Sequence, residues 1–193
     1  MNLTFCPVTE DRWSDFERLI ESRGGPHNCW CMAWRNNEHA KTIAGKAGKK
    51  AAIRKRVTDA TPIGLLAYSD GESIAWCSIA PRDTHKPLGG DPSLDDVWSV
   101  TCFFVKRQFR SMGISHRLLE AAIDFAEVDG ARHVEAYPVD ADSPSYRFMG
   151  FVPMFESAGF RFVQMAGSRR KVMVLDLPAT GRFDKGQLFG ATE

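Results

Sequence analysis

The stretch between residues 96 and 126 constrains the fold of this chain more than any other part of the sequence. Residues 96–105 are rich in β-branched and aromatic side chains, which indicates a buried strand. Residues 114–126 carry apolar side chains at helical spacing and predict an amphipathic helix. A short cationic turn that contains Gly113 lies between them. The sequence therefore predicts a strand, a glycine turn and a helix in direct succession.

This turn has the chemistry of an anion-binding site. The first turn of a helix has backbone N–H groups without intrahelical partners, and the helix dipole adds partial positive charge there. Gly113 lets a ligand approach the backbone closely because it has no side chain. We therefore expect a diphosphate ligand at the turn. The alternative is an ordinary connection in which Gly113 relieves strain and Arg107 and Arg110 are only solvated.

Two segments carry a resemblance to a known family. Residues 110–115, Arg-Ser-Met-Gly-Ile-Ser, resemble the (Arg/Gln)-x-x-Gly-x-(Gly/Ala) motif of the GNAT superfamily of acyl-CoA-dependent N-acetyltransferases, with Ser115 as a departure at the last position. Residues 155–160 resemble the later aromatic-x-x-x-Gly-Phe element of that family. The strand and helix that flank the first motif supply the setting in which it binds a ligand.

The rest of the chain fits one domain. We expect a hairpin at Asp70-Gly71 and parallel pairing of the strands 96–105 and 133–137, because a helix joins them. The resemblance implies an α/β (α+β) fold over residues 1–177, with a mixed, splayed central sheet flanked by helices, and a polar tail over residues 178–193. Strands are expected at 3–8, 62–69, 73–80, 96–105, 133–137, 160–165 and 171–177, and helices at 13–22, 47–57 and 114–126.

Bulk composition limits the partners. The net charge is +1, from 25 basic and 24 acidic residues, so no overall field favours nucleic acid or a membrane surface. The N-terminus lacks the pattern of a signal peptide, and no apolar run reaches the roughly 18 residues of a membrane span. Five cysteines, an odd number, lie partly in apolar runs and favour a reducing compartment. We expect a cytoplasmic protein without nucleic-acid or membrane partners, and a homodimer remains open.

The resemblance implies that acetyl-CoA is the acyl donor and that a primary amine of an acceptor attacks it directly in a ternary complex. Backbone groups of Phe103 and Val105 would pair with the pantetheine arm, and the amides from Arg110 through Ser115 would bind the pyrophosphate. The alternative for Phe103 and Val105 is a purely structural role in the core. The expected donor-binding residues are Phe103, Phe104, Val105, Arg110, Ser111, Met112, Gly113, Ile114 and Ser115.

The catalytic groups follow the family less closely. Phe155 stands where many members have a tyrosine that protonates the departing thiolate, so we expect another donor and select Tyr146. Asp95, Asp96 and Glu135 are candidates for the general base by their position along the chain. Each has a structural alternative: Tyr146 as a half-buried loop aromatic, Asp95 and Asp96 as the end of a loop, and Glu135 as a surface strand residue.

The acceptor site is expected in the irregular segment 24–45, since the family commonly builds one wall of that site between its first two helices. Trp30, Trp34 and Arg35 would line it, and Arg82 would hold an acceptor carboxylate. The alternatives are that the tryptophans close the core beneath a long loop and that Arg82 only bridges loops. The sequence leaves the acceptor open between a small-molecule and a peptide amine.

Two further functions compete with the acetyltransferase. The substitution at Phe155 suggests a non-catalytic acyl-CoA-binding or sensing module. Cys29 and Cys31, with His27 and His39 nearby, suggest a zinc or thiol-redox protein. Their Cys-x-Cys spacing lacks the two-residue gap of common structural zinc sites, and no second pair matches it, so we expect no metal.

Overall fold

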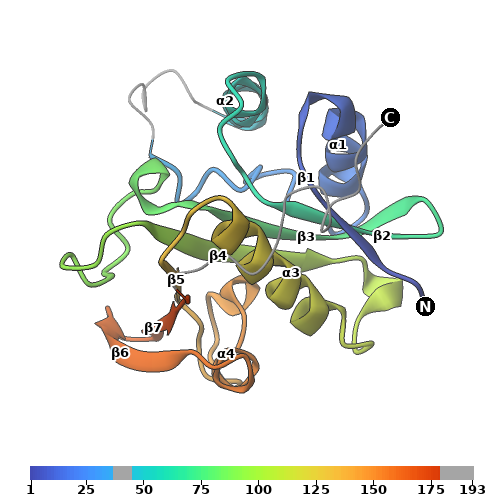
Figure 1. Cartoon of the computed structure of the whole chain (residues 1–193). Helices are drawn as coiled ribbons and strands as arrows, with labels where there is room; N and C mark the ends of the chain where they lie inside the picture. Colours follow the sequence, from blue (N-terminus) through green and yellow to red (C-terminus); the bar gives the residue numbers. More distant parts are fainter. Residues whose placement is uncertain (37–44, 179–193) are drawn as a thin grey trace.

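The computed structural model describes residues 1–36 and 45–178 (Figure 1). Its centre is one mixed sheet in the order β1-β2-β3-β4-β5-β7-β6, flanked by helices, as predicted. The strands are β1 Thr4–Pro7, β2 Leu65–Ser69, β3 Glu72–Pro81, β4 Val97–Val105, β5 His133–Ala136, β6 Arg161–Ala166 and β7 Arg170–Asp176. The helices are α1 Trp13–Glu21, α2 Gly45–Thr58, α3 Ile114–Val128 and α4 Val152–Ser157.

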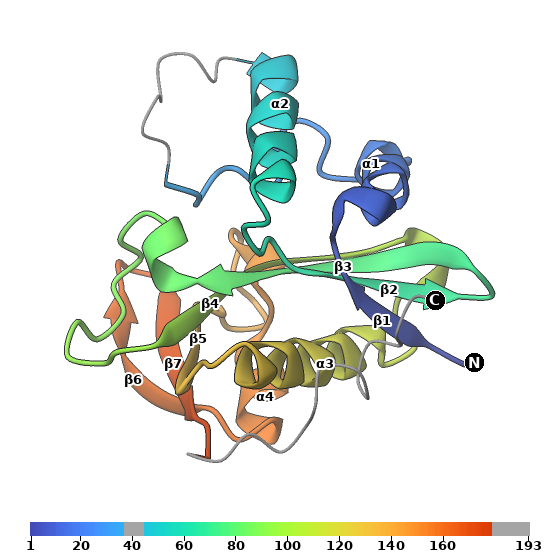
Figure 2. The ribbon, with the colours of Figure 1, turned by 45° about the horizontal axis from the view of Figure 1, so that its top comes forward.

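Helices cover both faces of the sheet, with α1 and α2 on one side and α3 on the other (Figure 2). The alternation of side chains along a strand explains this, because successive residues point to opposite faces. Leu65 packs in the core beneath α3, whereas its neighbour Leu66 packs in the core beneath α1 and α2. The central strands are therefore buried on both faces.

Both predictions about strand pairing are confirmed. β2 and β3 form an antiparallel hairpin whose turn residues, Asp70 and Gly71, have φ angles of 50° and 78°. These values match the type I′ turn that suits the twist of a hairpin. β4 and β5 pair in parallel.

The sheet opens in its middle. The parallel pairing of β4 with β5 extends only from Val97 to Val100, although β4 continues to Val105. A bulge lies at the same level, since Ser78 pairs with Cys102 and Ile79 pairs with Val100, which leaves Thr101 as the extra residue. A bulge bends its strand and strengthens the local twist. The second half of β4 therefore diverges from β5.

Some expectations differ from the structure in detail. The connection 138–152 contains a short 3₁₀ turn, Arg147–Met149, and an isolated bridge between Val139 and Phe151. Nearly all of the expected tail lies outside the described residues.

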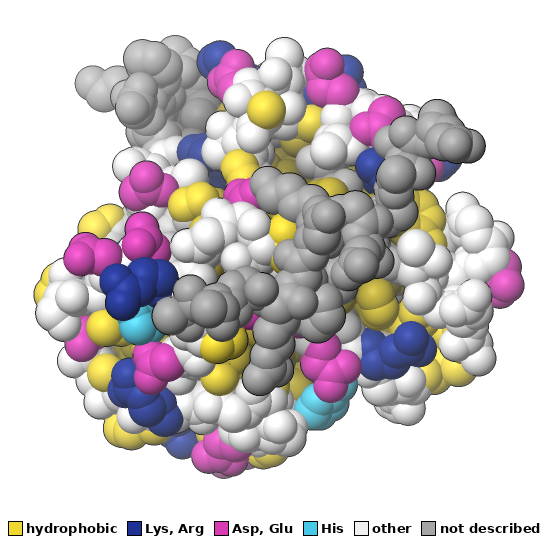
Figure 3. All heavy atoms as spheres, viewed as in Figure 1, with side chains coloured by type: hydrophobic (Ala, Val, Ile, Leu, Met, Phe, Trp, Pro, Cys, Tyr) yellow, Lys and Arg dark blue, Asp and Glu magenta, His cyan; other side chains and the backbone are white. Residues whose placement is uncertain are grey.

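Within residues 1–36 and 45–178, none of the helices has the length and apolar character needed to cross a membrane. On the face shown in Figure 3, basic and acidic side chains are interspersed, in keeping with the near-neutral net charge.

Candidate functional site

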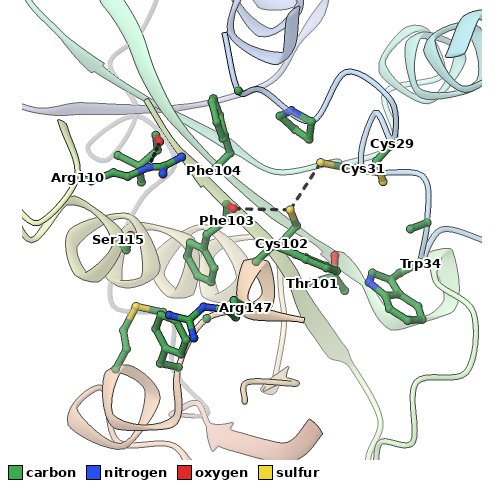
Figure 4. A pocket seen from close by; sticks show the side chains of 18 residues that line it. Cys29, Cys31, Trp34, Thr101, Cys102, Phe103, Phe104, Arg110, Ser115 and Arg147 are labelled. Carbon is green, nitrogen blue, oxygen red and sulfur yellow. Dashed lines mark hydrogen bonds between the residues drawn. The ribbon is translucent and has the colours of Figure 1, made fainter. Parts of the chain in front are cut away.

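A cavity of about 560 Å³ lies where β4 separates from β5. Its walls come from four segments: the second half of β4, the turn and first residues of α3, residues 147–154, and the connection from α1 to α2. Figure 4 shows Arg110 and Ser115 at one end of the cavity and Trp34 at the other, with Cys102 and Phe103 between them. The opening of the sheet thus creates a cleft between segments that are distant in sequence.

The backbone of β4 is open toward this cleft. Lys106 N–H donates to the Ile74 carbonyl at 3.0 Å, and Phe104 pairs with Trp76 in the same register, so these residues direct their backbone groups toward β3. Phe103 and Val105 direct theirs to the opposite side, where β5 has ended. Arg110 Nε donates to the Val105 carbonyl at 3.0 Å, which ties the turn to the strand.

The turn before α3 leaves the amides of the helix accessible. Gly113 has the left-handed φ of 73° at the N-cap, and none of the described side chains caps the helix there. A Cβ at Gly113 would meet no atom within 4 Å, so glycine serves the backbone conformation and not packing. Ser111, Met112 and Gly113 are exposed, and the next residue, Ile114, is buried. The first N–H groups of α3 therefore face open space.

Phe155 is a core residue. It is fully buried, packs edge-on against Phe160 with ring centroids 5.2 Å apart, and also contacts Phe103 at 6.2 Å. A Cβ at Gly150 would lie 2.7 Å from the Phe155 ring. Phe155 lies where the resembled family motif often has tyrosine. Its apolar side chain is enclosed by its neighbours.

Tyr146 lies beside the end of the cavity that Trp34 lines. It is half-buried, and its ring lies 6.1 Å from that of Trp34, with Arg170 of β7 5.5 Å from its centroid. The residues that follow it, Arg147 and Phe148, line the cavity. The structure therefore brings Tyr146 next to the cleft wall without making it part of the lining.

The expected general bases lie elsewhere. Asp95 and Asp96 border a separate small cavity at the start of β4. Glu135 is fully buried, so the alternative of a surface strand residue is wrong. Tyr137 and Ser99 donate to its Oε1.

Arg82 pairs with Glu135 Oε2 at 2.6 Å and also donates to the carbonyls of Asp91 and Leu94. Burial and the charge of Glu135 raise the pKa of Tyr137. Arg82 thus bridges a loop to a buried carboxylate. It is not among the described residues that line the cleft.

Trp34 reaches the cavity, whereas Trp30 and Arg35 do not. Trp30 is fully buried and stacks on Trp13, with ring centroids 6.1 Å apart. Arg35 is also fully buried and donates to the Ile63 carbonyl at 2.6 Å. Burial, followed by the charge of Arg56, lowers the pKa of Arg35 to about 9. These two residues form part of the core, because the segment that carries them folds back over the sheet.

Several residues in the cavity wall or next to it had no role assigned from the sequence. Cys102 had the pattern of a small strand hydrophobe, and nothing in the sequence distinguished Arg147 or Arg170 from other surface arginines. Among the described residues, no group of three or more potential metal ligands is found, and His39 lies outside those residues. The cavity wall includes Cys29, Cys31, Cys102, Arg147, Phe148 and Met154.

Comparisons with known proteins agree with this geometry. The sequence matches the acetyltransferase (GNAT) family over residues 4–151. A search of curated proteins gives no significant match.

Three solved structures share the fold at low identity. The PaiA N-acetyltransferase of Thermoplasma acidophilum, solved with coenzyme A, has a TM-score of 0.54 at 15% identity, covering 92% of this chain and 100% of the other. An aminoglycoside acetyltransferase, AAC(6′)-Ib, also solved with coenzyme A, has a TM-score of 0.57 at 15% identity over 91% and 95% of the two chains. The ribosomal-protein-S18-alanine N-acetyltransferase of Escherichia coli has a TM-score of 0.54 at 12% identity over 94% and 97%. The family match covers most of the sequence, so the chain belongs to the acetyltransferase (GNAT) family.

Proposed function

We propose that the protein is an N-acetyltransferase that moves an acetyl group from acetyl-CoA to a primary amine in the cleft between β4 and β5. The observation that carries the proposal is that two sets of backbone N–H groups face the same cleft: those of Phe103 and Val105, on the side of β4 where β5 has ended, and those of the uncapped first turn of α3. Family membership and two similar structures solved with coenzyme A support the identity of the donor.

The residues present fit such a donor at both ends. The amides after Gly113 and the positive end of the α3 dipole suit a pyrophosphate, and Arg110 and Ser115 line the cavity beside them. The N–H groups of Phe103 and Val105 that face the cleft suit the amide carbonyls of a pantetheine arm, whereas the carbonyls of these two residues accept from Cys102 and Arg110. Bound acetyl-CoA supplies a thioester whose carbonyl carbon an amine can attack. Holding an amine in line with it makes the reaction effectively unimolecular.

Proton transfer is the part of the proposal in which this chain departs from the family motif. Phe155 cannot donate a proton, and we propose Tyr146 as the donor because it stands at the cavity wall beside Trp34. None of the described residues that line the cavity carries a carboxylate. Glu135 is engaged by Arg82 and two hydroxyl groups, and Asp96 borders another cavity, so we assign neither as the base. We propose that the acceptor binds as a free amine or loses its proton to water.

The acceptor end favours an amine without additional positive charge. Arg147 lines the cavity on the Phe103 side (Figure 4), and Arg170, which is not among the lining residues, lies 5.0 Å from the centroid of the Trp34 ring. One guanidinium group in the cavity and one beside it, with no carboxylate among the described lining residues, repel a polycation and attract an acidic group. We propose an amino acid or a peptide amine as the acceptor, in preference to a polyamine or an aminoglycoside.

A second candidate function is a module that binds acyl-CoA without turnover. The buried Phe155 favours it, since the usual proton donor of the family is missing. The two functions share the donor site and differ in the chemical step. A binding measurement combined with an acceptor screen therefore separates them.

The test is calorimetric titration with acetyl-CoA, followed by mass spectrometry of a panel of amino acids, peptides, polyamines and aminoglycosides. We expect binding, and acetylation of members of the first two classes. Gly113→Trp places a large side chain at the proposed pyrophosphate site and should abolish binding. Gly130→Trp is the matched control, because Gly130 also has a positive φ, of 90°, and open space around it, but follows α3.

Binding by Gly113→Trp equal to that of the parent protein would refute the donor site. Binding without acetylation of any amine would select the non-catalytic module.

A further inference from the structure

Two cysteines that are far apart in sequence meet in the cavity wall. Cys31 comes from the connection between α1 and α2, and Cys102 comes from β4 just after the bulge. Their Sγ atoms are 3.9 Å apart, and both residues line the cavity. Figure 4 shows the two sulfur atoms pointing toward each other. A small molecule in the cleft therefore reaches a pair of thiols.

The surroundings of Cys31 favour its thiolate. The indole Nε1 of Trp76, a fully buried residue, donates to Cys31 Sγ at 3.1 Å. Cys31 donates to Cys102 Sγ at 3.9 Å, and Cys102 donates to the Phe103 carbonyl at 3.8 Å. The indole N–H stabilises negative charge on Cys31 Sγ, and once Cys31 has lost its proton only Cys102 can donate within the pair.

A buried cation lies on the same side of the sheet. Arg35 is fully buried, and its described hydrogen-bond partners are the neutral groups of Ile63, Ser78 and Thr84. None of the ion pairs found among residues 1–36 and 45–178 includes Arg35. A buried charge without a counter-ion is costly. A thiolate at Cys31 places a negative charge near this cation, and the two groups shift each other's pKa toward the charged form.

The titration behaviour of the two thiols agrees with this arrangement. The hydrogen bond with Cys102, then the indole of Trp76 and the charge of Arg35, lower the pKa of Cys31. The hydrogen bond with Cys31 and burial raise the pKa of Cys102 well above its usual value. Cys29, next but one to Cys31, has its pKa raised by burial. Cys31 is thus distinguished from both other thiols of the cavity.

We propose that Cys31 and Cys102 form a thiol–disulfide exchange site in the cleft, where Cys31 attacks a low-molecular-weight disulfide and Cys102 resolves the product. The sequence suggested a redox pair of Cys29 and Cys31, and the structure instead places Cys102 opposite Cys31. The proposal goes beyond acetyl transfer and does not depend on it.

The reaction balances in two steps. The Cys31 thiolate attacks one sulfur of the disulfide RS–SR, forms a Cys31–S–S–R bond and releases RS⁻. Cys102 then gives its proton to RS⁻ and attacks Cys31 Sγ, which forms the Cys31–Cys102 disulfide and releases the second RS⁻. The two cysteines are oxidised, and the small disulfide is reduced to two thiols. The new bond ties the α1–α2 connection to β4 across the cavity wall.

The test treats the reduced full chain with glutathione disulfide in one arm and with coenzyme A disulfide in the other. Intact-mass and peptide mass spectrometry should show loss of two hydrogen atoms and a Cys31–Cys102 linkage. Either arm that gives this linkage supports the proposal, and the relative rates identify the source of the disulfide. Absence of the linkage in both arms would overturn it.

Single variants assign the two roles. Cys102→Ser should stop at a mixed disulfide on Cys31, and Cys31→Ser should leave Cys102 unmodified. Cys29→Ser is the matched control, because Cys29 lines the same cavity, and it should behave like the parent protein. Mixed disulfides on Cys29, or on Cys102 in Cys31→Ser, would contradict the assignment.

A measurement on the parent protein covers the case in which a variant fails to fold. Iodoacetamide at neutral pH should alkylate Cys31 at least about tenfold faster than Cys29, as expected for a thiol with a lowered pKa. Equal rates at the two cysteines would overturn the proposal. Titration with acetyl-CoA remains a separate test of the donor site, so failure of one proposal is distinguishable from failure of the other.

Discussion

At the scale of single residues, the most informative side chains are polar groups that the fold buries. His85 is one of them. It lies in an isolated bridge with Arg35 and is almost completely buried, with Nδ1 3.2 Å from the Pro81 carbonyl. Burial and the charge of Arg35 lower the pKa of His85 well below its ordinary value, so the folded protein holds a neutral imidazole.

This burial predicts an acid-sensitive fold. As pH falls below about 6.5, the unfolded chain binds a proton at His85 and the folded chain does not, so the free energy of unfolding decreases by up to about 1.4 kcal/mol per pH unit. His85→Asn keeps an N–H donor near Nδ1 but cannot titrate. We expect the variant to lose less stability than the parent between pH 6.5 and pH 5 in urea unfolding. Parallel stability curves for the two proteins over this range would contradict the prediction.

At the scale of elements, β4 is central because its second half lines the proposed binding cleft. Its first half pairs on both sides, whereas its second half pairs with β3 alone. The bulge at Thr101 marks the change. One strand therefore serves both as the centre of the sheet and as an open edge inside a cavity. A proline substitution removes one backbone N–H. Placed at neighbouring residues of β4, it therefore tests separately the side that faces the cleft and the side that pairs with β3.

Phe103→Pro removes an N–H that faces the cleft and leaves the ladder with β3 intact. We expect the dissociation constant for acetyl-CoA to rise by about tenfold, which corresponds to about 1.4 kcal/mol for a lost hydrogen bond. Calorimetric titration measures this constant. Phe103→Ala is the matched control, since it also loses the contact with the Phe155 ring but keeps the N–H.

Phe104→Pro places the same change on the side of β3. It leaves a buried carbonyl unpaired in the sheet, at a cost of about 1–3 kcal/mol, and should lower the melting temperature more than Phe103→Pro does. Equal affinities of Phe103→Pro and Phe103→Ala for acetyl-CoA would exclude the proposed use of this N–H.

At the scale of the whole molecule, the cleft exists only because four segments converge on it. Trp34 shows this most clearly. Its ring contacts Tyr146 from the connection after β5 and Arg170 from β7, at 6.1 Å and 5.0 Å. These contacts lie at the Trp34 end of the cavity, whereas Arg110 and Ser115 lie at the opposite end, where we propose that the donor binds (Figure 4).

Trp34→Leu should therefore affect only one of the two substrates. Loss of the ring–ring and cation–π contacts, worth about 1–2 kcal/mol together, should raise KM for the acceptor by about tenfold. The dissociation constant for acetyl-CoA should remain unchanged. Steady-state kinetics with any amine found in the panel, combined with calorimetry, measures both constants.

Trp98→Leu is the matched control, because Trp98 packs on Phe125 of α3 with ring centroids 5.3 Å apart and does not line the cavity. It should lower stability without changing KM. A similar increase of KM in both variants would show that the effect comes from general loosening of the fold.

Local sequence patterns predicted most of the helices and strands, and they predicted a donor-binding turn before α3. Hydrophobic period, the Asp70-Gly71 turn and the Gly113 turn are local signals, because backbone sterics and helix-end hydrogen bonding act within a few residues. The parallel pairing of β4 and β5 followed from the helix between them, and the mixed sheet was implied by the resemblance to the family. The expectation for Gly113 needed no knowledge of distant residues.

The positions of the polar and aromatic candidate residues depend on tertiary packing. Trp30 and Arg35 belong to the core, Glu135 is enclosed with Arg82, and Cys31 faces Cys102 across 71 positions of sequence. A side chain becomes a ligand, a thiolate or an ion-pair partner through what surrounds it, and those neighbours are set by packing between distant segments. The Trp34 end of the cavity and the thiol pair result from that packing and have no local sequence signature.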